Sequence, residues 1–372
     1  MIEASASLRH KVLDLAVALQ HIPSPTFAER ARAEYVFSLL SREDVCDAEI
    51  DAVGNVYARL PGRRRGRPLV VSAHTDTVFP AATVLTGKRE AQKIYGPGIG
   101  DNSLGVAGLF GLLWSIREQK LDFPGDIWLV ANVAEEGLGD LRGMRAVVDR
   151  FGEAVCAYLI LEGMALGQIY HRGLGVQRYR IMVSTSGGHS WVDYGKPSAI
   201  HELGNLVTRL TALSVPSQPR SSLNVGVIAG GTSINTIAAE AHLELDLRSE
   251  NSAALNQLVH QVETLVGAAN RPDVAVTLEL IGRRPAGKLP STDPLVRLAK
   301  RCLLAQGLQP NLTIGSTDAN VPLSRGLPAI CVGLSTGYGA HTLNEYINVG
   351  PLFQGLAQLV AVVEGIFQEL CS

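Results

Sequence analysis

The chain has 372 residues, of which 46% are hydrophobic and 18% are charged, and this balance excludes an intrinsically disordered protein. The 33 Lys and Arg residues nearly balance the 35 Asp and Glu residues, so the chain lacks the basic field that binds nucleic acid. A chain of this length predicts two domains rather than one small core.

The five cysteines are odd in number, widely spaced and free of any C-x-x-C motif. They are Cys46, Cys156, Cys302, Cys331 and Cys371. This usage predicts free thiols in a reducing compartment. We find no apolar segment of a signal peptide near Arg9 and Lys11, and we expect no apolar stretch of 18 residues. The prediction is a cytoplasmic protein that neither spans nor binds a membrane.

The first half of the chain alternates between helical and strand patterns. Helices are predicted over 8–20, 28–41 and 102–119, and strands over 47–52, 55–60, 68–73, 127–133 and 155–161. A helical segment separates the last two strands. Short apolar strands that alternate with helices indicate βαβ units, in which helices cover both faces of a parallel sheet.

The pattern changes near Gly173. From there to about residue 283, apolar residues alternate with polar ones in strands, as in an antiparallel sheet with one wet face. Examples are Leu223, Val225 and Val227, then 243–247 and 274–280, with helical patterns at 200–210 and 255–265. With a first strand at 176–185, the order is β-α-β-β-α-β, a ferredoxin-like unit.

After Arg284 the sequence returns to the pattern of apolar strands and helices that is typical of a buried α/β sheet. We therefore predict the α/β class, with a mixed or parallel sheet. Residues 1–173 and 284–372 form one domain, and residues 174–283 form an inserted α+β domain.

One strand ends in a candidate metal ligand. His74 and Asp76 follow the apolar run that starts at Leu69, and residues two apart in an extended chain point the same way. This geometry suits an imidazole that binds a metal while a carboxylate holds its second nitrogen. An isolated His-x-Asp pair is more often an ordinary strand-end hydrogen bond, so the remaining sequence has to decide between the two interpretations.

Further acidic and imidazole side chains follow other predicted strands. They are Asp101, Glu135, Glu136, Glu162 and His341. In an open α/β sheet, sites gather beyond the carboxyl ends of the strands. Oxygen and nitrogen ligands without cysteine suit two zinc-like ions that share a bridging carboxylate. Asp101 alone is equally well explained as a helix cap, but adjacent carboxylates such as Glu135 and Glu136 repel unless a cation holds them.

Six short motifs make the pattern recognisable. They lie at 72–78, 96–101, 135–137, 161–163, 187–190 and 339–341. Together, in this order, they resemble the zinc-dependent aminoacylase and carboxypeptidase family that includes acetylornithine deacetylase, succinyl-diaminopimelate desuccinylase and tripeptidases. The resemblance implies a di-metal catalytic domain with an inserted lid domain, which is also the architecture that the patterns predict.

The resemblance implies two divalent metal ions, zinc or alternatively cobalt or manganese. One ion would be held by His74, Asp101 and Glu162, and the other by Glu136, Asp101 and His341. Asp76 would orient His74, and Glu135 would carry the proton between the attacking water and the leaving amine.

The resemblance also implies residues that bind the substrate. His189 and Asn235 would polarise the carbonyl, and Arg248 and Thr317 would contact the carboxylate end. Structural alternatives stay open for three of them: a histidine in a glycine turn, a capping asparagine and an exposed strand arginine. Trp191 stands where a small residue is common in the family, which leaves the substrate subclass open.

The resulting hypothesis is a di-zinc hydrolase that cleaves an amide or peptide bond of a small substrate with a free carboxylate. It would be a carboxypeptidase or an N-acyl-amino-acid deacylase. The alternatives are a di- or tripeptide aminopeptidase and a catalytically inactive metal-binding relative. Many relatives dimerise through the lid and present the residue that matches His189 to their partner, so the resemblance implies a homodimer.

Overall fold

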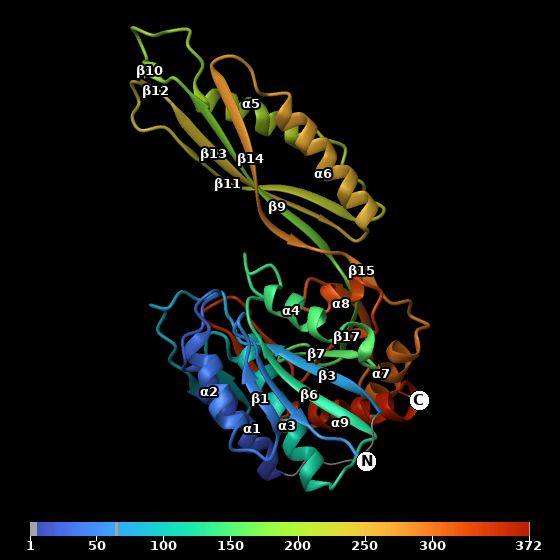
Figure 1. Cartoon of the computed structure of the whole chain (residues 1–372). Coiled ribbons are helices and arrows are strands. Elements are labelled where there is room, and N and C mark those ends of the chain that lie inside the picture. Colours follow the sequence, from blue (N-terminus) through green and yellow to red (C-terminus); the bar gives the residue numbers. More distant parts are fainter. Residues whose placement is uncertain (1–5, 64–65, 372) are drawn as a thin grey trace. The chain divides into compact units, whose positions relative to one another are not determined.

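The computed structural model describes residues 6–63 and 66–371 and contains two compact units (Figure 1). We call Leu174–Gly287 the inserted unit and the remaining described residues the main unit. The insertion ends at Gly287 rather than at residue 283. Its last strand, β14 (Val274–Arg284), stays paired with β9 (Gly175–Thr185) as far as Arg284, which carries the unit past the predicted boundary.

The main unit is built on a mixed sheet with nine strands in its described part. Their order is β1-β2-β6-β3-β7-β17-β8-β15, with β16 paired to β8. The strands are β1 (Cys46–Ile50), β2 (Val56–Leu60), β3 (Gly66–His74), β6 (Gly125–Asn132), β7 (Tyr158–Glu162), β8 (Gln168–Gly173), β15 (Gly287–Lys288), β16 (Asn311–Gly315) and β17 (Ala329–Gly333). β6, β3, β7 and β17 run parallel. Every residue of β17 is buried, as expected of a strand covered on both faces.

Helices pack around this sheet. They are α1 (Ala6–Gln20), α2 (Arg30–Leu40), α3 (Leu104–Glu118), α4 (Arg142–Phe151), α7 (Pro294–Ala305), α8 (Asn320–Ser324) and α9 (Leu352–Glu369), with the short turns η1 (Ile99–Ser103) and η2 (Gly152–Ala154). α3 contacts α1, α9, β3 and β7, so it is the central helix of the unit.

The segment 99–118, formed by η1 and α3, is long and apolar enough to cross a membrane by length and composition. This corrects the expectation that the chain contains no such segment. However, 89% of its most apolar window is buried inside the protein. The burial identifies the segment as a core helix, in line with the helix predicted at 102–119.

A small antiparallel sheet joins two segments of the main unit that are far apart in sequence. Its strands are β4 (Lys88–Arg89), β5 (Lys93–Tyr95), β18 (Gly337–Tyr338) and β19 (Tyr346–Asn348), in the order β18-β19-β5-β4. β5 and β19 are too short to leave a periodic pattern in the sequence. Their pairing brings the loop after β5 next to the loop before β19, and both loops carry predicted ligands.

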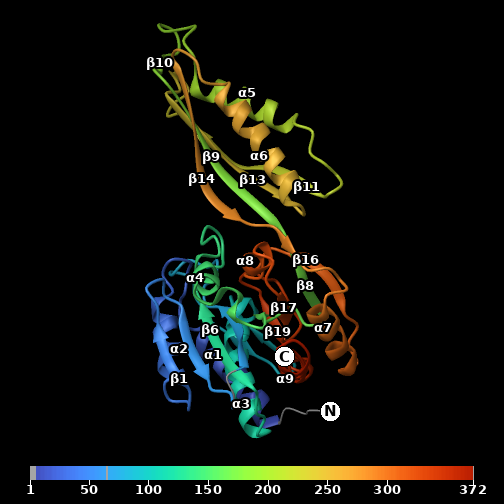
Figure 2. The ribbon, with the colours of Figure 1, turned by 45° about the vertical axis from the view of Figure 1, so that its right-hand side comes forward.

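The inserted unit has the element order β9, α5, β11, β13, α6 and β14. Its helices are α5 (Ala199–Thr211) and α6 (Ser252–Gly267), and its other strands are β10 (Gly188–His189), β11 (Ser221–Gly230), β12 (Thr236–Ile237) and β13 (Glu240–Ser249). Four strands form an antiparallel sheet in the order β11-β13-β9-β14. Both helices lie on one face of this sheet (Figure 1 and Figure 2), over a core that is separate from that of the main unit.

The predicted alternation fails at one position in β11. Val227 was expected to share the apolar face with Leu223 and Val225, but it is 44% exposed. The register between β11 and β13 shifts between Val225 and Val227, which pairs Val227 with Glu244 on the polar face. An extra residue, here Gly226, reverses the faces to which the following side chains point.

Two of the five cysteines are joined. Cys156 and Cys371 form a disulfide with their Cα atoms 5.3 Å apart, whereas Cys46, Cys302 and Cys331 are free thiols in the described chain. The prediction of five free thiols is therefore wrong for this pair. Sequence spacing gave no sign of the bond because 215 positions separate the two cysteines. The cytoplasmic location, which rested partly on free thiols, stays a prediction.

Candidate metal centre

The five predicted ligands come together at one edge of the main sheet. β3, β6 and β7 run parallel, so their carboxyl ends meet at that edge. His74 ends β3, Glu162 ends β7, and Glu136 lies in the loop after β6. Asp101 lies in η1 directly before α3, and His341 lies between β18 and β19.

The five side chains form two groups that share Asp101. In the first, Nε2 of His74 lies 3.2 Å from Oδ1 of Asp101 and 3.8 Å from Oε1 of Glu162. In the second, Nε2 of His341 lies 3.0 Å from Oδ2 of Asp101 and 3.0 Å from Oε1 of Glu136. Within each group the candidate ligand atoms all lie within 4.8 Å of one another. Because Asp101 presents a different oxygen to each imidazole, it can bridge two ions.

The electrostatics of these groups fit a cation site. Burial opposes a charge on His74, but hydrogen bonds to Asp101 and neighbouring carboxylates outweigh burial and raise the pKa of His74 well above its usual value. Hydrogen bonds to Asp101 and Glu136 raise the pKa of His341 to about 10. The carboxylates thus favour positive charge between them, which divalent ions supply when they displace the imidazole protons. Imidazole and carboxylate donors suit zinc, cobalt or manganese.

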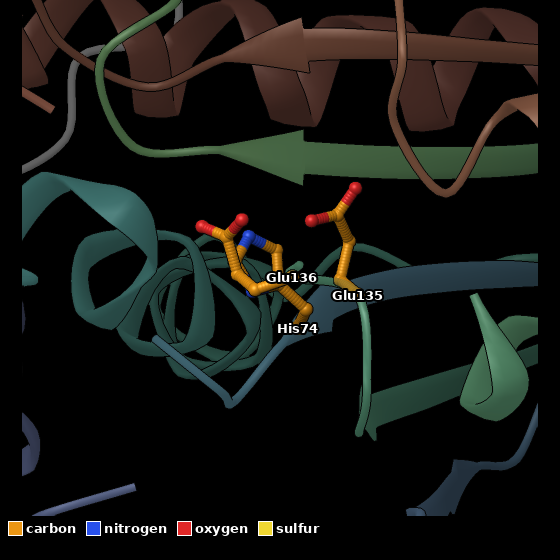
Figure 3. A group of neighbouring side chains, drawn as sticks. All are labelled: His74, Glu135 and Glu136. Atoms are coloured by element: carbon orange, nitrogen blue, oxygen red, sulfur yellow. The ribbon is translucent and has the colours of Figure 1, made fainter. Parts of the chain in front are cut away.

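Glu135 and Glu136 are adjacent and buried, yet their side chains lie differently (Figure 3). In this view the carboxylate of Glu136 lies beside the ring of His74, whereas Glu135 stands to one side. One ligand atom of each of these three residues lies within 4.8 Å of the other two. Glu136 also contacts His341. Glu135 therefore borders the ligand groups without belonging to either of the two groups that share Asp101.

Asp76 holds the loop of the two glutamates as well as His74. Nδ1 of His74 lies 3.1 Å from the backbone oxygen of Asp76 and 3.5 Å from its Oδ1, so the backbone oxygen is the better partner. The Asp76 carboxylate instead accepts the N–H of Glu135 at Oδ1 (2.9 Å) and the N–H of Glu136 at Oδ2 (2.8 Å). The spacing of His74 and Asp76 did not predict this second contact.

Sequence reasoning also missed two residues that support this loop. The hydroxyl of Thr26 donates to Oδ2 of Asp76 at 2.9 Å. Oε1 of Glu29, which is buried, accepts the N–H of Ala134 at 3.1 Å. Ala134 has a left-handed φ of 57°, so Glu29 holds an uncommon backbone conformation directly before Glu135. No local pattern marks these residues, because their partners lie 50 and 105 positions away.

Three predicted substrate-binding residues lie in the inserted unit, and the structure brings two of them together. His189 and Asn235 are both exposed, and the N–H of Ser190 donates to the backbone oxygen of Asn235 at 3.0 Å. Arg248 lies near the far end of β13, where its Nε donates to Oδ2 of Asp246 at 2.6 Å. Arg248 is thus separated from His189 and Asn235 within the unit.

The fourth residue, Thr317, lies in the main unit in the turn before α8. Its hydroxyl accepts the N–H of Ala319 at 3.2 Å, and its own N–H donates to Oδ1 of Asn320 at 3.1 Å. These bonds place Thr317 in the structure of the turn, and its contact with substrate stays a prediction.

Residues 70–366 match the model of Peptidase family M20/M25/M40. The matched span includes the five candidate ligands described above. The chain belongs to Peptidase family M20/M25/M40. As a member of this family, it is a metal-dependent peptidase or amidohydrolase.

Individual proteins of known name are similar to this chain over most of their length. Carboxypeptidase G2 of Pseudomonas sp. is 24% identical over 312 residues, which cover 80% of this chain and 73% of that protein. A tripeptidase structure from Staphylococcus aureus has a TM-score of 0.82 at 20% identity, covering 99% of this chain and 100% of that one. The YXEP structure from Bacillus subtilis, a dinuclear metal binding peptidase, has a TM-score of 0.70 at 16% identity, covering 98% and 99%. At these identities the two structures show a common fold.

Proposed function

We propose that this M20 protein hydrolyses an amide or peptide bond beside a free carboxylate, as a carboxypeptidase or an N-acyl-amino-acid deacylase. The observation that carries the proposal is the pair of ligand groups that share Asp101. We assign two divalent ions to them, zinc or alternatively cobalt or manganese. One belongs to His74, Asp101 and Glu162, and the other to Asp101, Glu136 and His341.

Ions in these positions supply the Lewis acidity that activates water and polarises the scissile carbonyl. We assign the proton transfers to Glu135, which takes a proton from the attacking water and returns it to the leaving amine. Its place supports this role, because Asp76 fixes its backbone N–H and its carboxylate borders both ligand groups. Glu136 serves instead as a ligand, since it contacts His341 at 3.0 Å.

We propose that the inserted unit, a ferredoxin-like βαββαβ domain by its element order, acts as a lid. Its His189 is prepared to donate a hydrogen bond. Nδ1 of His189 accepts the backbone N–H groups of Trp191 (3.2 Å) and Val192 (3.4 Å). A neutral imidazole whose Nδ1 accepts carries its proton on Nε2. That N–H, together with the side chain of Asn235, would stabilise negative charge on the carbonyl oxygen.

Two observations favour a substrate with a free carboxylate: the position of Arg248 and the similarity of this chain to carboxypeptidase G2. Arg248 presents a guanidinium on the polar face of β13, and such a group binds carboxylates well. The second candidate, a di- or tripeptide aminopeptidase, is favoured by the tripeptidase from Staphylococcus aureus that shares the fold. The two differ in what they require of the substrate. A carboxypeptidase or deacylase accepts a blocked amino terminus, whereas an aminopeptidase needs a free one.

We expect wild-type protein to hydrolyse N-acyl amino acids and N-blocked dipeptides, and to lose activity when their C-terminal carboxylate is amidated. Arg248→Ala should lower kcat/KM on the free acids by roughly 10–100-fold, the scale of one charged hydrogen bond, and change the residual activity on amides little. Steady-state kinetics on matched free-acid and amidated substrates measure both effects.

Arg178→Ala is the matched control, because Arg178 also pairs with Asp246, at 2.9 Å. Equal losses on the two substrate forms in Arg248→Ala would reject the carboxylate clamp. Activity confined to peptides with a free amino terminus would establish the aminopeptidase instead.

We also propose a homodimer through the lid, in which His189 acts on the site of the partner chain. His189 lies beyond the start of β13 and Arg248 near its end. From Glu240 to Arg248 the strand spans roughly 26 Å at about 3.3 Å per residue. A small substrate held by Arg248 is therefore out of reach of His189 in the same inserted unit. If both residues contact one substrate, they come from two chains.

Mixing two inactive variants, His189→Ala and Glu135→Ala, tests this arrangement. A mixed dimer contains one site with an intact Glu135 from one chain and an intact His189 from the other. Random pairing makes half the dimers mixed, so activity should recover to roughly a quarter of wild type. A proven subunit exchange without recovery, or a monomer in solution, would show that His189 serves its own chain.

A further inference from the structure

Glu345 is a buried carboxylate that the proposed reaction does not use. It is 0% exposed and lies directly before β19, in the same loop as His341. Its two oxygens accept three backbone N–H groups from the segment that ends at Asp101. Oε2 accepts the N–H of Gly98 at 2.7 Å, and Oε1 accepts those of Gly100 at 2.7 Å and Asp101 at 2.8 Å.

The segment that Glu345 holds is tightly packed. Gly98 has a φ of +75°, and a Cβ on this residue would lie 2.9 Å from Cγ2 of Thr77. A Cβ on Gly100 would lie 2.3 Å from Cγ of Met164. The backbone therefore runs through the interior with its N–H groups turned toward Glu345. Buried N–H groups require an acceptor, so this carboxylate determines the path of the segment.

Glu345 also connects the two segments that carry ligands. β5 leads into the segment of Asp101, β19 follows the loop of His341, and the two strands pair. At the same point the N–H of Gly96 donates to the backbone oxygen of Glu345 at 2.9 Å. Asp101 and His341 are thus fixed to one another through Glu345, and their facing atoms, Oδ2 and Nε2, lie 3.0 Å apart.

We propose that Glu345 is a positioning residue for the metal centre. It sets the separation of Asp101 and His341, because its carboxylate binds the backbone N–H of Asp101 and its own backbone lies in the loop that carries His341. This inference rests on the proposed function, because it assigns Glu345 a role only in relation to metal ligands. It goes further in naming a residue that touches neither ion nor substrate and yet controls metal affinity.

The test measures metal affinity in the full-length chain. Metal-free protein is titrated with Co²⁺, followed by its visible absorption, and with Zn²⁺ by calorimetry. Glu345→Ala should weaken at least one of the two binding steps by about 10–100-fold, the usual effect of removing a partner of metal ligands, and should change the Co²⁺ spectrum. Glu345→Gln should show a smaller but measurable loss, because its amide oxygen can still accept the N–H groups of Gly100 and Asp101, whereas its NH2 group cannot accept the N–H of Gly98.

Asp293→Ala is the control for general destabilisation. The side chain of Asp293 accepts the N–H of Leu295 at the start of α7, at 2.9 Å. The substitution therefore removes a similar contact between a carboxylate and a backbone N–H, but in a segment that carries no candidate ligand. All titrations are made well below the melting temperature of each variant. A loss of affinity in Glu345→Ala that is absent in Asp293→Ala supports the proposal.

Wild-type affinity and spectrum in Glu345→Ala would overturn it. If that variant does not fold, unchanged affinity in Glu345→Gln overturns it equally. A wild-type chain that binds no divalent ion would overturn the proposed function itself. That outcome is distinct, because it is seen before any variant is compared.

Discussion

Removal of divalent ions should abolish hydrolysis, and the purified chain should bind close to two ions. The structural reason is the pair of ligand groups that share Asp101. Without ions, burial raises the pKa of Glu162 to about 7, and the imidazoles of His74 and His341 take up protons between carboxylates. In that state no divalent ion is present to activate the attacking water. Metal analysis of the protein, before and after chelation, gives the stoichiometry.

Removal of the ions should also lower the stability of the folded chain. An ion that binds only the folded chain, present at 100 times its dissociation constant, stabilises that chain by about 2.7 kcal/mol. Chelation should therefore lower the melting temperature as well as the activity. Zn²⁺, Co²⁺ or Mn²⁺ should restore both, and Ca²⁺, which prefers oxygen ligands, serves as the control ion. Full activity in a sample shown to be free of metal would reject the mechanism.

Glu135→Ala should keep its ions and lose roughly 10²–10⁴-fold in kcat, the usual contribution of general acid–base catalysis. The neighbouring substitution, Glu136→Ala, should lose metal instead, because Glu136 lies within the ligand group of Asp101 and His341. The contrast is informative because the two residues are adjacent and equally buried. Metal content and single-turnover rates of both variants, at matched metal loading, measure it.

Glu135→Gln controls for packing, since it keeps the shape of the side chain but cannot take the proton. It should be as inactive as Glu135→Ala. If instead Glu135→Ala loses metal and Glu136→Ala keeps it, the roles of the two residues are exchanged. If Glu135→Gln retains most of the activity, another group transfers the proton.

Much of the fold follows from local patterns. The period of apolar residues predicts α1 and α2 within two residues of their ends, and the apolar runs predict the strands β3, β6 and β7. Such patterns are visible because the side chains that face the core recur at a fixed spacing, every three or four residues in a helix and every second residue in a strand with one buried face. The pattern misplaces Val227, because the bulge at Gly226 depends on pairing with another strand.

The candidate site, like the fold, is only partly predictable from the sequence. His74 and Glu162 are recognisable in the sequence because each ends an apolar strand, where sites in α/β sheets collect. The contacts that support them are not recognisable. Asp76 binds the loop of Glu135 across 59 positions, and Glu345 binds the segment of Asp101 across 244 positions.

The sequence by itself therefore determined which side chains are available as ligands and on which strands and loops they lie, because these follow from residue type and local periodicity. Only the tertiary structure decided which groups the supporting carboxylates bind. Asp76 and Glu345 are acidic like Asp101 and Glu162, but their oxygens accept backbone N–H groups. That difference is set by which distant N–H groups the fold buries beside each carboxylate, since a buried N–H needs an acceptor.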